Sequence, residues 1–223
     1  MNKSFKHLLF VCIGLLPLLY LAFIWGTIPE QVPTHFNVKM QPDSYSSKTG
    51  FFFIQCFLAV VSVAVYFLLQ NIHKLDPKRA HKGMSPVFDK IAMGMVVFMA
   101  ALGFVTIHMS LGSTIAVGKL MPSLIGLLFA FLGNLMHNVK PNYFVGVRLP
   151  WTLNSDQNWR KTHQLTGKLW FAGGVLLAVL SLFLPVEAGA YVMMIILAVL
   201  VLIPIFYSYS LYRKEQGNIT IDQ

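Results

Sequence analysis

Phe51–Gln70 reads FFFIQCFLAVVSVAVYFLLQ, a run that contains no Asp, Glu, Lys or Arg. A helix needs about 17–25 mostly apolar residues to cross the hydrocarbon of a bilayer. Only helices and closed barrels satisfy their backbone groups in lipid, and a run this continuous lacks the alternation of barrel strands. The segment therefore predicts a transmembrane helix. Five further runs predict the same: Phe5–Trp25, Ile91–Leu111, Ile115–Met136, Leu169–Pro185 and Tyr191–Tyr212.

The composition supports this interpretation for the whole chain. Of the 223 residues, 56% are hydrophobic and 11% are charged, whereas soluble domains carry about 25% charged residues. The first apolar run exceeds the ~7–15 residues of a cleavable signal, and no A-x-A site follows Trp25, so we expect a retained anchor. Cys12 and Cys56 lie within apolar runs and are expected to be packing residues. We predict an all-α, polytopic membrane protein with six transmembrane helices.

Basic residues fix the predicted orientation. If the N-terminus is cytoplasmic, 14 of the 17 Lys and Arg residues fall on the inside, and only Lys39, Lys48 and Lys119 fall outside. The positive-inside rule then predicts that both termini are cytoplasmic. We attribute the formal charge of +9 to topology and anionic lipid, not to nucleic acid. We divide the chain into residues 1–90, with helices 1 and 2, and residues 91–223, with helices 3–6.

Two polar segments are expected on opposite sides of the membrane. The outside loop Gly26–Gly50 contains Pro29, Pro33 and Pro42, which predicts irregular structure. The inside segment Asn142–Trp170 is basic and rich in tryptophan.

The inside segment also carries a helical pattern. Pro150 ends any helix through Arg148, and Asn154 with Gln157 marks a new helix start. Four residues then recur on one helical face: Trp159, His163, Thr166 and Trp170. This pattern predicts a short interfacial helix before helix 5. We expect Trp151, Trp159 and Trp170 at the lipid boundary.

Residue types that carry chemistry are scarce. No charged residue lies in the middle of a predicted span, which argues against an ion-coupled pump. Paired carboxylates, an H-E-x-x-H motif and a nucleophile beside a base are not recognisable, so we predict neither an enzyme nor a cofactor. His35 and Asp43 share the outside loop, but two ligands do not make a metal site. The role of His108 stays open. The stripe Ser123, Gly126, Ala130 and Gly133 predicts close helix packing.

Both polar segments resemble known families. Ile28–Lys48 resembles the membrane domain catalogued as DUF1648, whose signature is approximately P-x-x-V-P-x-H-F/W-N-x-x-G-x-P-D. Pro29, Val32, Pro33, His35, Phe36, Asn37, Pro42 and Asp43 match it, and Met40 replaces the usual glycine. The inside segment resembles the SdpI family, with the pattern N-x-x-x-G-I/V-R-T-P-W-T-L followed by W-x-x-T-H-x-x-x-G-K-L. Asn142, Gly146, Arg148, Pro150, Trp151, Thr152, Leu153, Trp159, Thr162, His163, Gly167, Lys168 and Leu169 match, and Leu149 replaces threonine.

The resemblance implies a function. SdpI proteins protect Bacillus-type cells from a secreted sporulation-delaying toxin, and the best-known member also captures a cytoplasmic repressor at the membrane. The resemblance implies that an outside partner meets Pro33, His35, Phe36, Asn37, Pro42 and Asp43. It implies that an inside partner meets Asn142, Gly146, Arg148, Pro150, Trp151, Thr152, Trp159, Thr162, His163 and Gly167.

Alternative interpretations remain open at this stage. The inside motif can be an interfacial belt and tight turn that has no partner. The whole chain can instead be a small permease or exporter for an amphipathic substrate, although Gln55, His108 and Asn134 offer little polar material for a path through the bundle.

Overall fold

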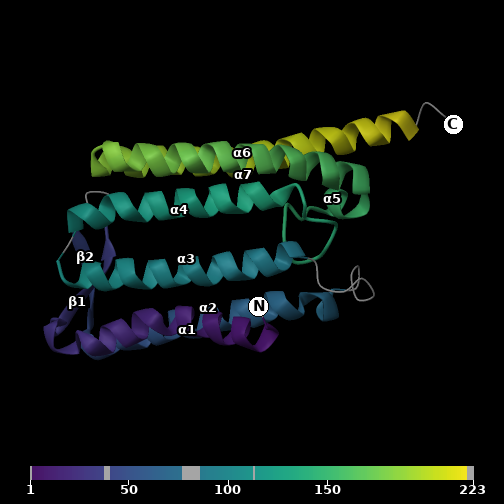
Figure 1. The fold of residues 1–223 in the computed structure, drawn as a ribbon. Helices are drawn as coiled ribbons and strands as arrows, with labels where there is room; N and C mark the ends of the chain where they lie inside the picture. Colours follow the sequence, from purple (N-terminus) through teal and green to yellow (C-terminus); the bar gives the residue numbers. More distant parts are fainter. Residues whose placement is uncertain (1, 38–40, 77–85, 113, 220–223) are drawn as a thin grey trace.

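The computed structural model describes residues 2–37, 41–76, 86–112 and 114–219. In this part of the chain six helices are long and apolar enough to cross a membrane, which confirms the predicted all-α, polytopic fold. They are α1 (Lys3–Phe23), α2 (Lys48–Leu75), α3 (Pro86–Ser110), α4 (Thr114–Met136), α6 (Asp156–Phe183) and α7 (Val186–Ile219). All six run nearly parallel or antiparallel to one long axis (Figure 1).

Helix packing separates the six spans into two groups of three. The helix α3 contacts both α1 and α2, while α4 contacts both α6 and α7. The two groups meet where α3 packs against α4. A tight turn joins these two helices, and Gly112 in it has φ +88°, a conformation that glycine adopts at no steric cost. The division of the chain at residue 90 stays a prediction. The helix α3, which contains that boundary, packs with the two helices that precede it.

The helix pair α4–α6 is packed through glycines, as the small-residue stripe predicts. A Cβ added at Gly126 would lie 2.6 Å from the backbone nitrogen of Ala178, and one added at Gly133 would lie 2.4 Å from that of Phe171. The Ser123 hydroxyl donates to the Ala178 carbonyl oxygen at 3.1 Å. Backbones this close gain dispersion contacts that larger side chains would prevent.

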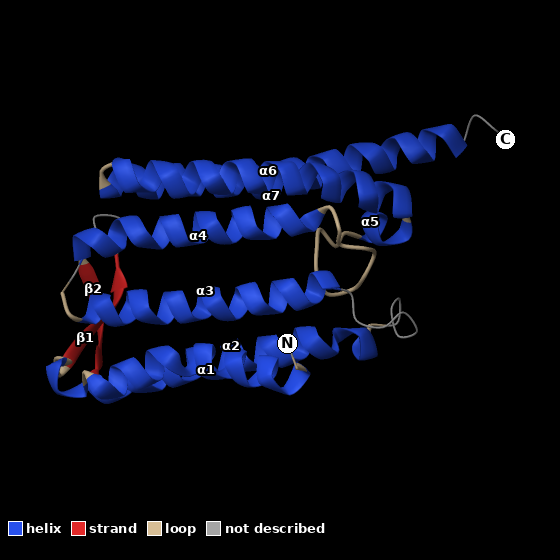
Figure 2. Ribbon diagram, in the orientation of Figure 1, coloured by secondary structure: helices blue, strands red, loops and turns tan. Residues whose placement is uncertain are grey.

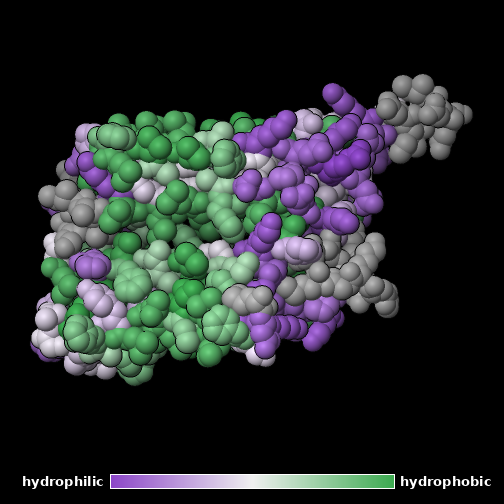
Figure 3. Space-filling view, in the orientation of Figure 1, coloured by the Kyte–Doolittle hydropathy of each residue, from purple (hydrophilic) through white to green (hydrophobic). Residues whose placement is uncertain are grey.

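The outer surface of the helices is apolar. Large side chains such as Phe23, Phe53 and Phe183 are mostly exposed, and the space-filling view shows an apolar expanse that ends at a polar cap near α5 (Pro150–Asn154) (Figure 3). An exposed apolar surface of this extent is stable only in lipid. The chain is therefore a multi-pass membrane protein.

The predicted outside loop contains more order than its sequence predicts. After the short helix η1 (Trp25–Thr27), β1 (Gln31–Phe36) and β2 (Pro42–Ser47) form an antiparallel hairpin, drawn in red in Figure 2. The prediction of irregular structure is thus wrong for these residues. A two-stranded sheet has two free edges, so Pro33 and Pro42 can lack a backbone donor there. Irregular register accompanies them, with shifts between Pro33 and Phe36.

The predicted interfacial helix is also wrong in its extent. Residues 156–183 form one continuous helix, α6, so the polar turns and the fifth span are a single element. The cap is Ser155, one residue after the predicted start, and its hydroxyl accepts from the Asn158 backbone N–H. The separate short helix is α5, which begins with Pro150. Proline suits the first position of a helix, where its missing donor costs nothing.

One of the three tryptophans occupies a different environment from the one expected. Trp159 is 1% exposed and belongs to the core, so its predicted place at the lipid boundary is wrong. Trp151 and Trp170 are partly buried. The indole N–H of Trp170 donates to the Leu200 carbonyl oxygen at 2.9 Å. The place of Trp151 and Trp170 at the lipid boundary stays a prediction.

The bundle has two distinct ends, which we name for what they carry. The hairpin end holds β1 and β2, and the motif end holds residues 137–156 with α5 (Figure 1). The helix α1 leads into the hairpin and α7 runs away from it, so the start of α1 and the end of α7 both lie toward the motif end. Met40, Lys39 and the predicted basic residues 78, 79 and 82 fall outside the described residues.

Candidate functional sites at the two ends of the bundle

The turn of the hairpin is closed by side chains that the sequence singles out. The Asn37 Oδ1 accepts from the Gln41 backbone N–H at 3.0 Å, and the Asn37 backbone N–H donates to the Gln41 carbonyl oxygen at 3.0 Å. The His35 Nδ1 lies 2.5 Å from the Asp43 Oδ1 across the two strands. Both members of this pair are largely exposed. In the described part of the chain no cluster of three or more His, Cys, Asp or Glu could hold a metal ion.

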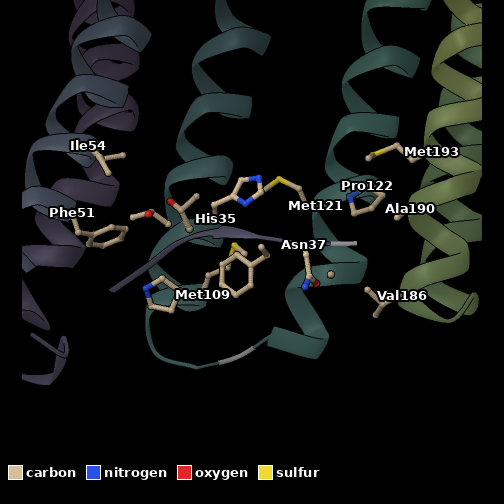
Figure 4. Close-up of a pocket in the computed structure, with 15 residues that line it drawn as sticks. His35, Asn37, Phe51, Ile54, Met109, Met121, Pro122, Val186, Ala190 and Met193 are labelled. Atoms are coloured by element: carbon tan, nitrogen blue, oxygen red, sulfur yellow. The ribbon is translucent and has the colours of Figure 1, made fainter. Parts of the chain in front are cut away.

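Beneath the hairpin lies a cavity of about 400 Å³, which we call the hairpin pocket. It lies between the two helix groups, since its walls come from α2 and α3 on one side and α4 and α7 on the other (Figure 4). Of the six predicted outside residues it is lined by Pro33, His35, Phe36 and Asn37, whereas Pro42 and Asp43 do not line it. Its other walls are mostly apolar: Phe51, Ile54, Met109, Met121, Pro122, Val186, Ala190 and Met193, with Thr34, Thr106 and Gly118.

At the motif end, Asn142 organises the loop between α4 and α5. Its side chain is fully buried. The amide nitrogen donates to the carbonyl oxygens of Lys140 and Val145, and the amide oxygen accepts from the backbone N–H groups of Phe144 and Val145. One asparagine thus satisfies four backbone groups of a loop that has no regular structure of its own. A shorter or apolar side chain at this position would leave these groups unpaired.

His163 joins α6 to this loop. Its Nδ1 lies 2.8 Å from the Trp159 carbonyl oxygen and therefore carries the proton, so Nε2 is free to accept from the Val147 backbone N–H at 3.0 Å. Gly146, just before Val147, has φ +121°. A Cβ there would lie 2.2 Å from the His163 Nε2. The hydrogen bond from Val147 to the imidazole is therefore possible only because residue 146 has no side chain.

Three more motif residues complete the scaffold. The Thr152 hydroxyl accepts from the Leu149 backbone N–H and donates to the Val147 carbonyl oxygen. The Trp159 indole N–H donates to the Val139 carbonyl oxygen at 2.8 Å. The Thr162 hydroxyl donates to the Asn158 Oδ1, and the Asn158 amide donates to the Ser208 carbonyl oxygen on α7. These contacts join α6 both to the loop and to α7.

Few motif residues reach the surface. Asn142, Thr152, Trp159, Thr162, His163 and Gly167 are buried, and Gly146 and Trp151 are partly buried. Arg148 and Pro150 are exposed. The Arg148 guanidinium donates to the Tyr143 carbonyl oxygen at 2.5 Å, so its head is held against the loop. The buried members can only shape a partner surface, and direct contact is open to the exposed ones.

Two acidic residues at this end were not predicted to matter. Asp76 ends α2, is 1% exposed, and accepts from the Tyr143 backbone N–H at 3.3 Å. It therefore connects the first helix group to the motif loop. Asp89 on α3 pairs with Lys6 on α1 and accepts from the Gln70 amide at 2.6 Å. The sequence could have indicated both residues, because Asp76 and Asp89 are the acidic residues of the otherwise basic segment between the second and third spans.

Comparisons with known proteins agree with both predicted resemblances. Residues 138–208 match the model of the SdpI/YfhL protein family, and residues 12–59 match the domain of unknown function DUF1648. The chain is 25% identical over 221 residues to "Immunity protein SdpI" of Bacillus subtilis (strain 168), an alignment that covers 98% of this chain and 100% of that protein. No solved structure matches. The predicted resemblance to SdpI proteins is confirmed, and with it the location in a bacterial membrane.

Proposed function

We propose that this chain is a non-enzymatic immunity protein that protects a bacterium from a secreted toxic peptide. The similarity to an immunity protein along 98% of the chain supports this function. The observation that carries it is the hairpin pocket, an apolar cavity at the predicted outer face whose walls include four residues of the DUF1648-like signature. Since the pocket lies between the two helix groups, a bound peptide can contact both.

The walls of the hairpin pocket suit an amphipathic peptide. Met109, Met121 and Met193 contribute unbranched, polarizable side chains that adapt to varied apolar shapes. Polar groups are few, and His35 and Asn37 come from the hairpin. A peptide that inserts an apolar side chain between the helices would keep its polar side near the exposed His35–Asp43 pair. Capture there would hold the toxin away from the bilayer.

A survival experiment with a matched pair of variants tests this proposal. Ala190 lines the hairpin pocket, whereas Met194, one turn further along α7, is 61% exposed and does not line it. The chain is expressed in Bacillus cells that lack their own SdpI-type protein and are exposed to the sporulation-delaying toxin. We expect the wild type and Met194→Phe to protect, and Ala190→Phe to lose most protection because its ring fills the cavity. Equal killing with and without the wild-type chain would contradict immunity to this toxin.

At the motif end we further propose that the exposed surface recruits a cytoplasmic repressor. Arg148 is exposed there, and its positive charge suits a partner with an acidic face. Under this proposal Arg148→Ala abolishes toxin-dependent recruitment of the repressor to the membrane, while survival is unchanged. Loss of survival in Arg148→Ala would instead assign the arginine to immunity itself.

The permease alternative would be supported if the polar residues within the spans lined one common cavity, and they do not do so in the described part of the chain. Gln55 is buried and donates to the Thr106 hydroxyl, His108 is exposed beside Tyr20, and Asn134 lies on the opposite half of α4 from the hairpin. None of the described pockets is lined by more than one of these three residues. We therefore prefer immunity to transport.

A further inference from the structure

A second cavity lies on the flank of the α4–α6 pair, near the motif end. It measures about 500 Å³ and is lined by Gly133, Asn134, His137, Gln164, Gly167, Lys168 and Phe171; we call it the α4–α6 pocket. Its base is the close approach of two glycines, since a Cβ at Gly167 would lie 3.0 Å from the Gly133 carbonyl oxygen. Nothing in the proposed immunity function uses this cavity.

The polar lining of the pocket is suited to an anion. Lys168 contributes a positive charge, and the amides of Asn134 and Gln164 contribute neutral donors. These three side chains are exposed. His137 is shared with a neighbouring cavity of about 560 Å³, whose lining includes Lys140 and Arg160. Asp156 is the one acid among the residues that line the two cavities, so the combined charge of their linings is positive.

The basic side chains are available to a ligand. In the described part of the chain the ion pairs are Lys6–Asp89 and His35–Asp43, and neither involves Lys140, Arg160 or Lys168. A positive cluster of this kind at a membrane surface attracts anionic headgroups, with about 1 kcal/mol for each Lys or Arg.

The surface that continues from the pocket toward the hairpin end is apolar. Phe171 lines the pocket and is 50% exposed, and Val175 and Val179 follow at intervals of four residues, each with more than a third of its surface exposed. Residues at this spacing share one face of α6. An acyl chain can lie along this face while its headgroup remains at Lys168. A free phosphate would gain nothing from the apolar face.

We propose that the α4–α6 pocket binds the phosphate headgroup of an anionic phospholipid, whose acyl chains follow the exposed face of α6. Lys168 holds the phosphate, and Asn134 and Gln164 donate to its oxygens. Lys140 and Arg160, which line the neighbouring cavity, add positive charge beside it. The proposal is independent of the toxin, and it places a specific lipid against the helix pair that carries the motif loop.

Native mass spectrometry of the full chain in detergent tests the site with phosphatidylglycerol as the probe. The variants are Lys168→Gln and the double variant Lys140→Gln/Arg160→Gln, and the control is Lys74→Gln. Lys74 is an exposed lysine of α2 that does not line either cavity. Each purified variant is first compared with the wild type by circular dichroism, so that a loss of fold is not taken for a loss of binding.

We expect phosphatidylglycerol to bind about fivefold more weakly to Lys168→Gln, the factor that about 1 kcal/mol gives, and more weakly still to the double variant. Lys74→Gln should bind as the wild type does, and neutral phosphatidylcholine should bind poorly to all. An equal loss in Lys74→Gln, or equal binding of phosphatidylcholine, would overturn the proposal. Displacement of the lipid by millimolar inorganic phosphate would also overturn it, because the site would then recognise a free anion.

Discussion

At the scale of single residues, the motif loop depends on a few side chains that replace regular secondary structure. His163 accepts from the Val147 backbone N–H, and Asn142 satisfies four backbone groups of the same loop. Buried backbone groups without such partners would each cost about 1–3 kcal/mol. The pattern of motif residues therefore has a structural cause, in addition to any role in partner binding.

Gly146 offers the sharpest test of this interpretation. Gly146→Ala introduces both a positive φ for a non-glycine residue and a Cβ 2.2 Å from the His163 Nε2. Gly112→Ala introduces only the positive φ, since nothing lies within 4 Å of its Cβ. We expect Gly112→Ala to lower the free energy of unfolding by about 1–2 kcal/mol, and Gly146→Ala to lower it further. Thermal unfolding in detergent, followed by tryptophan fluorescence, compares the melting temperatures of the two variants. Equal melting temperatures would contradict the proposed contact.

At the scale of elements, the α4–α6 pair is the packed centre of the second helix group. Its glycines bring two backbones into contact, and the Ser123 and Ser181 hydroxyls lie 2.8 Å apart across the pair. The stripe on α4 predicted this packing, but its partner helix was identifiable only from the structure, because spacing along one helix does not reveal which helix it meets.

Substitution of Gly133 tests whether the close contact between α4 and α6 stabilises the second helix group. In Gly133→Ala the new methyl would lie 2.4 Å from the Phe171 backbone nitrogen, so the two helices must separate. Gly189→Ala, at the start of α7, places its methyl in open space. We expect the first variant to unfold at a clearly lower temperature than the wild type in detergent, and the control to unfold at about the same temperature. An unshifted Gly133→Ala would show that α4 and α6 can repack freely.

The sequence predicted the membrane-spanning helices well and the other elements less well. Length and apolarity located all six spans, because the lipid requirement dominates every other preference. The extent of α6 was missed because polar residues before Leu169 suggested a separate interfacial helix, whereas Asn158, Thr162 and His163 among them are buried against the loop and α7. The hairpin was missed because its prolines indicate irregular structure, and only the free edges of a two-stranded sheet accommodate them.

The candidate sites were predicted less completely. Pro33, His35, Phe36 and Asn37 were singled out and do line one cavity. The opposite wall, with Met121 and Ala190, could not be predicted, since it depends on how the two helix groups meet. Asp76 was also missed, because its partner is a backbone group 67 positions away.

At the scale of the whole molecule, the fold places one polar segment at each end of a lipid-facing bundle. The hairpin pocket opens between the two helix groups, and Asp76 of the first group accepts from the motif loop of the second. A ligand that shifts one group against the other would therefore be felt at the motif end. The proposed function, with a toxin outside and a repressor inside, is compatible with this arrangement.

The central claim is that the hairpin and the motif loop face opposite sides of the membrane. Single cysteines at Ser44 and Gln157, both exposed, in a chain with Cys12→Ala and Cys56→Ala, test it with a membrane-impermeant maleimide. We expect Ser44→Cys to be labelled in intact cells, and Gln157→Cys to be labelled only after permeabilisation. Labelling of both positions in intact cells would contradict it.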